Sequence, residues 1–143
     1  MSFVLDNSVV MRWFFGDGSQ KDLEYSLAVL EQVPLSRVMV PAVWSLEVTN
    51  VIVRAETKGL VSEARSAEFV RLLADMDIKE ETIESSLVFG NVLSIARRYS
   101  ISTYDASYLE LAMRNGVELA TLDVDLIRAA NQAGVSQFLS QQM

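Results

Sequence analysis

Four acidic residues occupy places in the sequence from which carboxylates can do chemistry. Two follow short apolar segments, one interrupts a long apolar segment and one opens a segment with helical periodicity: Asp6 and Asp123, Glu47, and Asp105. Carboxylates that converge on one place repel one another unless cations neutralise them. Oxygen ligands favour hard cations such as Mg²⁺ or Mn²⁺, and one or two such ions activate water for attack on a phosphodiester.

Three of these acids also have a purely structural interpretation. Asp6 and Asp123 lie where a strand passes into a helix, and Asp is a preferred N-cap at such a junction. Asp105 falls in a first helical turn, where the helix dipole favours an acid. Asp125 is an equally acidic neighbour of Asp123. No single acid is decisive, but in a parallel α/β fold all four positions can converge on one crevice.

Glu47 lies in a predicted helix that is apolar nearly all round. Glu47, Asn50 and Arg54 share one face of it, at spacings of three and seven residues. That face is either a narrow solvated stripe, with a Glu47–Arg54 contact, or a buried one. Helices that are apolar on all sides are usually buried, and a buried carboxylate needs a cation or a metal ion as its partner.

The composition excludes several kinds of site. The chain has 143 residues, with 12 basic and 19 acidic side chains, a net charge of −7, and neither His nor Cys. Disulfides, thiolate nucleophiles, Cys-type zinc sites and Ser-His-Asp machinery are therefore excluded. The acidic balance argues against a protein that coats DNA through a basic stripe, but it leaves room for a nuclease whose acids bind metal.

Strand and helix patterns alternate along the chain, which predicts a single α/β domain over residues 1–143. Its expected architecture is a three-layer α/β/α arrangement with a mostly parallel central sheet. We expect Pro41 in the first turn of a helix, Gly59 at a helix end, and Ser62 and Thr103 as N-caps. The predicted strands cover 2–5, 37–40, 117–121 and 135–138, and the predicted helices cover 22–33, 42–58, 62–75, 83–99, 103–116 and 124–133.

No membrane segment or signal peptide is expected. The longest apolar runs, such as residues 38–44, are far shorter than the roughly 18 residues that a membrane span needs. The N-terminus has no basic region, and Asp6 interrupts its first apolar run. A cytoplasmic location is the expectation.

Four segments of the chain resemble the motifs of one known family. The resemblance is to the PIN domain and, within it, to the VapC-like ribonuclease toxins of toxin–antitoxin pairs. Each segment contains one of the four acids, and the second also has an Asn three residues after its Glu; the segments are 4–14, 41–50, 103–112 and 121–126. Asn7 occupies a place that the family often gives to a small residue.

The resemblance implies a Mg²⁺- or Mn²⁺-dependent endoribonuclease. The acids that would bind the metal and act in catalysis are Asp6, Glu47, Asp105 and Asp123. Supporting polar groups would be Ser8, Asn50 and Thr121, and Asp125 would share or replace the role of Asp123. Members of this group are commonly homodimers that a small antitoxin inhibits by inserting into the active-site groove, so RNA, an antitoxin and a second copy are the expected partners.

Basic and aromatic residues near the first two motifs have two interpretations. Arg12 and Arg54 are candidates for contacts with RNA phosphates, or are simply surface charges. Aromatic residues nearby could stack on bases, although core packing is the commoner role; these are Trp13, Phe14, Phe15 and Trp44. The apolar run 11–15 is expected in the core, or else at a dimer or antitoxin contact.

Three other functions compete with a nuclease. A phosphoacceptor receiver domain would need a Lys at a late strand end, where this chain has none. A haloacid-dehalogenase-type phosphatase would need Asp-x-Asp after the first strand, and Asp6-Asn7-Ser8 lacks the second Asp. A catalytically silent PIN-like module that binds RNA or protein stays open as the alternative.

Overall fold

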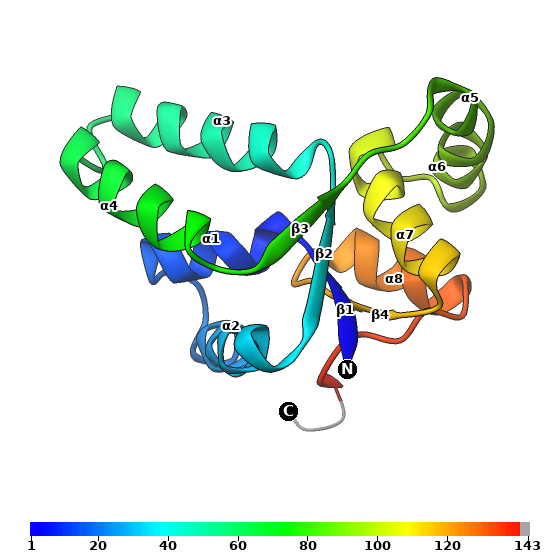
Figure 1. Cartoon of the computed structure of the whole chain (residues 1–143), viewed down its shortest axis with the longest axis horizontal. Coiled ribbons are helices and arrows are strands. Elements are labelled where there is room, and N and C mark those ends of the chain that lie inside the picture. Colours follow the sequence, from blue (N-terminus) through cyan, green and yellow to red (C-terminus); the bar gives the residue numbers. More distant parts are fainter. Residues whose placement is uncertain (141–143) are drawn as a thin grey trace.

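The centre of the molecule is a four-stranded sheet in which every pairing is parallel (Figure 1). The computed structural model describes residues 1–140. The strand order is β3-β2-β1-β4, so the first strand of the chain lies in the middle. The strands are β1 (Ser2–Leu5), β2 (Arg37–Pro41), β3 (Ile78–Glu81) and β4 (Glu118–Ala120).

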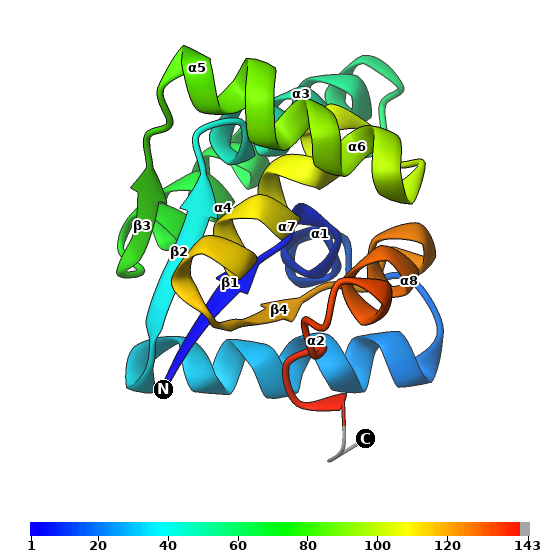
Figure 2. The ribbon, with the colours of Figure 1, turned by 90° about the vertical axis from the view of Figure 1, so that its right-hand side faces the viewer.

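Helices cover both faces of this sheet, which confirms the predicted α/β/α architecture. The helices α1 to α4 lie on one side of the sheet and α5 to α8 on the other (Figure 1), and α7 crosses directly over the strands (Figure 2). The connections from β1 to β2 and from β2 to β3 cross the sheet in one direction, and the connection from β3 to β4 crosses it in the other. Because such crossovers are right-handed, the helices of the two sets lie on opposite faces. The helices are α1 (Asn7–Phe15), α2 (Gln20–Gln32), α3 (Trp44–Thr57), α4 (Glu63–Ala74), α5 (Ser85–Leu87), α6 (Leu93–Tyr99), α7 (Thr103–Asn115) and α8 (Val124–Gln132), with short turns η1 (Val33–Leu35) and η2 (Val88–Val92).

The core is built around β1. Its residues Phe3, Val4 and Leu5 are completely buried, as expected for a central parallel strand with helices on both faces. Phe3 stacks on Phe138, with ring centroids 4.0 Å apart. In the apolar run 11–15, Met11 and Phe14 are buried in the same core, which confirms that packing accounts for this segment.

Two predicted helix starts have different outcomes. Ser62 caps α4 as expected, because its hydroxyl accepts a hydrogen bond from the Arg65 backbone. Thr103 is not a cap: it is the first residue of α7, and the preceding Ser102 accepts a 3.0 Å hydrogen bond from the Asp105 backbone. Gly59 follows the end of α3 with φ +73°, a left-handed conformation that favours glycine.

The prediction for Pro41 was wrong, and β3 was not predicted. Pro41 is the last residue of β2 and pairs with Glu81, while α3 begins only at Trp44. The strand β3 has the sequence Ile-Lys-Glu-Glu, in which no residue is fully buried. It is an edge strand that pairs with β2 through its backbone. Because most of its side chains are polar, it lacks the apolar run from which a strand is predicted.

Two further predicted elements are shorter than expected. Residues 135–138 form a single bridge between Leu119 and Gln137 rather than a strand, because the chain turns at Leu139 with φ +62°. The predicted helix 83–99 starts at Ser85 and divides into α5, the π-helical η2 and α6. Among residues 1–140, none of the helices combines the length and the apolar character required to cross a bilayer.

Candidate active site

The four acids lie at one edge of the sheet. Asp6 follows β1 and is the N-cap of α1, and Asp123 follows β4 and is the N-cap of α8. Glu47 and Asp105 lie in the first turns of α3 and α7. Carboxyl ends of parallel strands share one edge, and helices that follow strands start there. Asp6 and Asp123 are therefore helix N-caps and, at the same time, members of the group of acids at this edge.

Asp6 is held by a network that joins β1 to the segment after β4. Its Oδ2 accepts hydrogen bonds of 2.6 Å from the Ser8 hydroxyl and 2.9 Å from the Thr121 hydroxyl. Ser8 Oγ in turn accepts the backbone N–H of Leu122, and Thr121 Oγ1 accepts that of Asp123. These peptide groups direct both hydroxyl protons toward Asp6. Within residues 1–140 all hydrogen bonds to the Asp6 carboxylate end on Oδ2, which leaves Oδ1 without one.

The pKa of Asp6 is raised from its usual range despite these hydrogen bonds. Burial is the largest cause, since the residue is only 5% exposed, and the charge of Asp123 adds to it. The hydrogen bonds from Ser8 and Thr121 act in the opposite direction. The site therefore contains a buried carboxylate whose ionised form is under-stabilised.

Glu47 is half-buried and is bound by a tyrosine. The hydroxyl of Tyr108 on α7 donates a 2.6 Å hydrogen bond to Glu47 Oε1. Burial and the charge of Asp6 raise the pKa of Glu47, and the Tyr108 hydrogen bond lowers it. Of the two alternatives for the face of α3 that carries Glu47, the structure shows neither full burial nor a fully solvated stripe: Glu47 is half-buried, whereas Asn50 and Arg54 are exposed. The ion pairs within residues 1–140 do not include a Glu47–Arg54 contact.

Asp105 shows most clearly that the acids lie together. Its pKa is raised to about 7, first by burial and then by the charges of four other acids; in decreasing order they are Asp123, Asp6, Glu47 and Asp125. The ion pairs formed within residues 1–140 include none of these five carboxylates. Negative charge therefore accumulates at this edge without a basic side chain to neutralise it.

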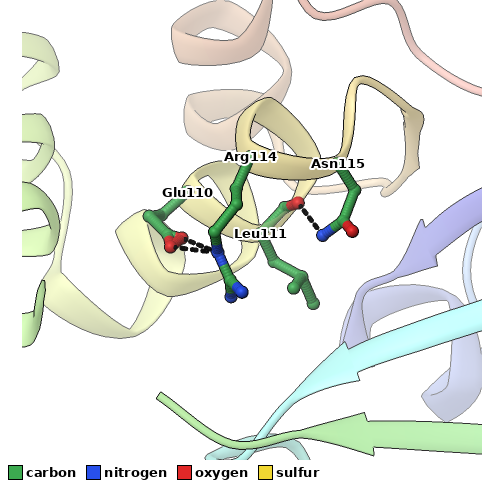
Figure 3. Close-up of polar contacts among 4 residues, drawn as sticks. All are labelled: Glu110, Leu111, Arg114 and Asn115. Atoms are coloured by element: carbon green, nitrogen blue, oxygen red, sulfur yellow. Dashed lines mark hydrogen bonds and ion pairs between the residues drawn. The ribbon is translucent and has the colours of Figure 1, made fainter. Parts of the chain in front are cut away.

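A buried carboxylate elsewhere in the chain illustrates the usual solution. Glu110 is 3% exposed, and both of its oxygens accept hydrogen bonds from Arg114 Nε, at 2.8 and 3.2 Å (Figure 3). The same turn of α7 is also tied by Asn115, whose amide donates to the Leu111 carbonyl. Glu110 is thus neutralised by an arginine of its own helix, whereas Asp6 forms no ion pair within residues 1–140.

The donor set fits a divalent cation. The side chains at this edge offer carboxylate oxygens, the ligands that Mg²⁺ and Mn²⁺ prefer. No group of three or more acids in the described part of the chain is already arranged around one ion. Mg²⁺ usually keeps several waters and takes only one or two carboxylates, so the free Oδ1 of Asp6 and a neighbouring acid meet its needs.

The remaining predicted residues are placed less uniformly. Ser8 and Thr121 belong to the Asp6 network, and Asn50 is exposed on α3, one turn beyond Glu47. Asp125 is exposed in the first turn of α8, and its charge contributes to the raised pKa of Asp105. Arg12 lies in the last turn of α1, the end away from Asp6, and forms a 2.9 Å ion pair with the exposed Asp17.

The aromatic residues near the first two motifs serve packing. Trp13 donates its indole N–H to the Ser26 carbonyl at 2.7 Å, and Trp44 is 8% exposed. Tyr108 was not among the predicted site residues. It lies three positions after Asp105, on the same face of α7, and that spacing is the signal in the sequence that could have identified it.

Comparison with known proteins identifies the family of the chain. A family model described as "PIN domain" matches residues 3–132. The chain belongs to the PIN domain family. A search of curated proteins found no match.

Two crystal structures are similar to this PIN domain in fold. PAE2754 from Pyrobaculum aerophilum has a TM-score of 0.66 and 17% identity, with 90% of this chain and 84% of that chain covered. FitAcB from Neisseria gonorrhoeae has a TM-score of 0.61 and 18% identity, with 95% of this chain and 96% of that chain covered. The PIN fold therefore extends over nearly the whole chain.

Proposed function

We propose that this PIN domain is a Mg²⁺- or Mn²⁺-dependent endoribonuclease. The observation that carries the proposal is the group of five carboxylates at the carboxyl edge of the sheet, among them the buried Asp6, which form no ion pair within residues 1–140. Membership of the PIN family supports a nuclease. The resemblance of the four motifs to VapC-like toxins supports RNA as the substrate.

The proposed roles follow from the contacts of each side chain. Asp6 offers Oδ1 to a cation, because Ser8 and Thr121 occupy Oδ2. Glu47 offers Oε2, since its other oxygen is taken by Tyr108. A divalent cation bound there would supply activated water and stabilise charge on the phosphoryl oxygens. Asp105 and Asp123 complete the group, with Asp125 close enough to assist.

The biological role that fits best is the toxin of a toxin–antitoxin pair. The motif resemblance supports a small antitoxin that binds over the group of acids, a homodimeric assembly and action in the cytoplasm. Because the chain carries a net charge of −7, general attraction to RNA is weak. Substrate choice in this proposal therefore depends on local shape and contacts, the usual basis of single-stranded RNA recognition.

An RNA cleavage panel tests the proposal. Wild type, Asp6→Asn and Asp105→Asn are compared with Asp77→Asn, an exposed acid outside the group, all purified identically to control for contaminating nucleases. Wild type and Asp77→Asn should cleave RNA in Mg²⁺ or Mn²⁺ and stop in EDTA, whereas the two site variants should lose cleavage while staying folded. Cleavage that survives EDTA or both site substitutions would refute the assignment.

The alternative is a catalytically silent PIN module that binds RNA or protein. It predicts no cleavage by wild type under any metal condition, together with RNA binding that Asp6→Asn leaves intact. The same panel, with a binding assay added, separates the two functions.

A further inference from the structure

Tyr108 connects three elements of the acidic site. Its side chain is completely buried, and α7, which carries it, packs against β1 and β2. Its hydroxyl donates the 2.6 Å hydrogen bond to Glu47 Oε1, a residue 61 positions earlier on α3. Asp105, one turn before Tyr108, faces the same group of acids. One helix therefore both contributes a carboxylate and binds a second one.

The hydroxyl of Tyr108 is buried beside acids of the candidate site. Burial raises its pKa far above the usual range, and the charges of Asp6 and Glu47 raise it further, while the backbone N–H of Asn7 acts in the opposite direction. In the structure this hydroxyl is the hydrogen-bond donor to Glu47 Oε1.

A second buried tyrosine shows what packing alone would require. Tyr25 is 4% exposed, and its hydroxyl donates to the Phe138 carbonyl at 2.7 Å. A buried tyrosine needs some acceptor, and a backbone carbonyl satisfies that need. The acceptor of Tyr108 is instead a carboxylate of the candidate site.

We propose that Tyr108 is a positioning residue that fixes the Glu47 carboxylate for cation binding by occupying Oε1 and leaving Oε2 free. The inference rests on the proposed metal-dependent function. Glu has several rotatable bonds, so without the phenol its carboxylate samples other conformers and must be ordered when the cation binds. Partners of ligating carboxylates typically contribute 10- to 100-fold to metal affinity.

The test measures Mn²⁺ binding to the protein without RNA, by calorimetry. Tyr108→Phe should weaken Mn²⁺ binding by about 10- to 100-fold, whereas the matched control Tyr25→Phe should bind as wild type does. In a Glu47→Gln background, Tyr108→Phe should cause no further loss. In RNA cleavage, Tyr108→Phe should raise the Mn²⁺ concentration needed for half-maximal rate and largely recover the rate at saturating Mn²⁺.

Wild-type affinity in Tyr108→Phe, or an equal loss in both tyrosine variants, would overturn the inference, as would absence of Mn²⁺ binding by wild type. If wild type binds Mn²⁺ but does not cleave RNA, the proposed function fails, and the affinity comparison still decides the role of Tyr108. If Tyr108→Phe does not fold, a second measurement uses Tyr25→Phe, which keeps Tyr108. Mg²⁺ should change the near-UV tyrosine absorption of this variant, and no change would contradict the inference.

Discussion

The hydroxyl of Thr121 donates a 2.9 Å hydrogen bond to Oδ2 of Asp6, a residue 115 positions earlier in the chain. The same hydroxyl accepts the backbone N–H of Asp123. One oxygen atom therefore joins the ends of β1 and β4 and sets the distance between two of the acids. Its position makes Thr121 a sensitive place to test the site.

Thr121→Val should impair both stability and cleavage, whereas Thr121→Ser should preserve them. Val removes a hydrogen bond to a charged group, worth about 1.5–3 kcal/mol, and leaves the Asp123 N–H without its acceptor. Ser keeps the hydroxyl in place. Urea unfolding and single-turnover RNA cleavage measure the two effects. Equal behaviour of the Val and Ser variants would mean that the hydroxyl does not organise Asp6.

Without divalent cations, the protein should become less stable as the pH rises from about 4 to 7. The pKa of Asp105 is about 7 in the fold, compared with 3.8 as its ordinary value. In that range the folded chain holds a proton that the unfolded chain has released, so raising the pH favours unfolding. The raised pKa values of Asp6 and Glu47 act in the same direction.

Asp105→Asn should remove part of this pH dependence and be more stable than wild type at pH 7.5 in EDTA. The neutral amide avoids the cost of holding a charge among the other acids. The measurement is the free energy of unfolding in urea at pH 5 and pH 7.5 for both proteins. Parallel profiles for the two proteins would show that Asp105 ionises normally.

Mg²⁺ should raise the melting temperature of wild type, and by more at pH 7.5 than at pH 5. A ligand that binds only the folded state adds about 2.7 kcal/mol at 100 times its dissociation constant. Protons compete with the cation for the carboxylates at the lower pH. Thermal melts with and without Mg²⁺ are compared with Asp6→Asn, in which the shift should largely disappear. The same shift in that variant would indicate binding elsewhere.

Arg114→Met should destabilise the fold without reducing the activity of the folded protein. It leaves the buried Glu110 carboxylate unpaired, at a cost of about 1–3 kcal/mol or more. The double variant Glu110→Leu with Arg114→Met should recover much of the loss, since no buried charge remains. Chemical unfolding and cleavage per folded molecule provide the readouts. Loss of specific activity would instead connect this pair to the site.

The parts of the fold that were predicted correctly are those in which burial leaves a pattern in the sequence. The strand β1 is a continuous apolar run ended by Asp6, and Gly59 marks the end of α3. The four acids were placed at one edge because strand ends and helix starts share that edge in parallel folds. These inferences need only local sequence and general topology.

The parts that were missed depend on partners distant in sequence. The strand β3 exists because its backbone pairs with β2, which its own polar side chains do not reveal. The spacing of Tyr108 from Asp105 places it on the face of α7 that carries the acid, but its hydrogen bond to Glu47, 61 positions earlier, is seen only in the structure. The exposure of Leu46 on α3 was likewise not predicted, because an apolar residue in a largely apolar helix is expected to be buried.

The position of β1 between β2 and β4 determines when the molecule can become complete. Val4 pairs with Met39 on one side and with Leu119 on the other, so β1 has both of its neighbours only when β4, more than 110 residues later in the sequence, is present. A chain that contains β1 and β2 but stops before β4 lacks both Thr121 and the acids that follow β4. Under the proposed function, such a chain has no complete cation site and should not cleave RNA.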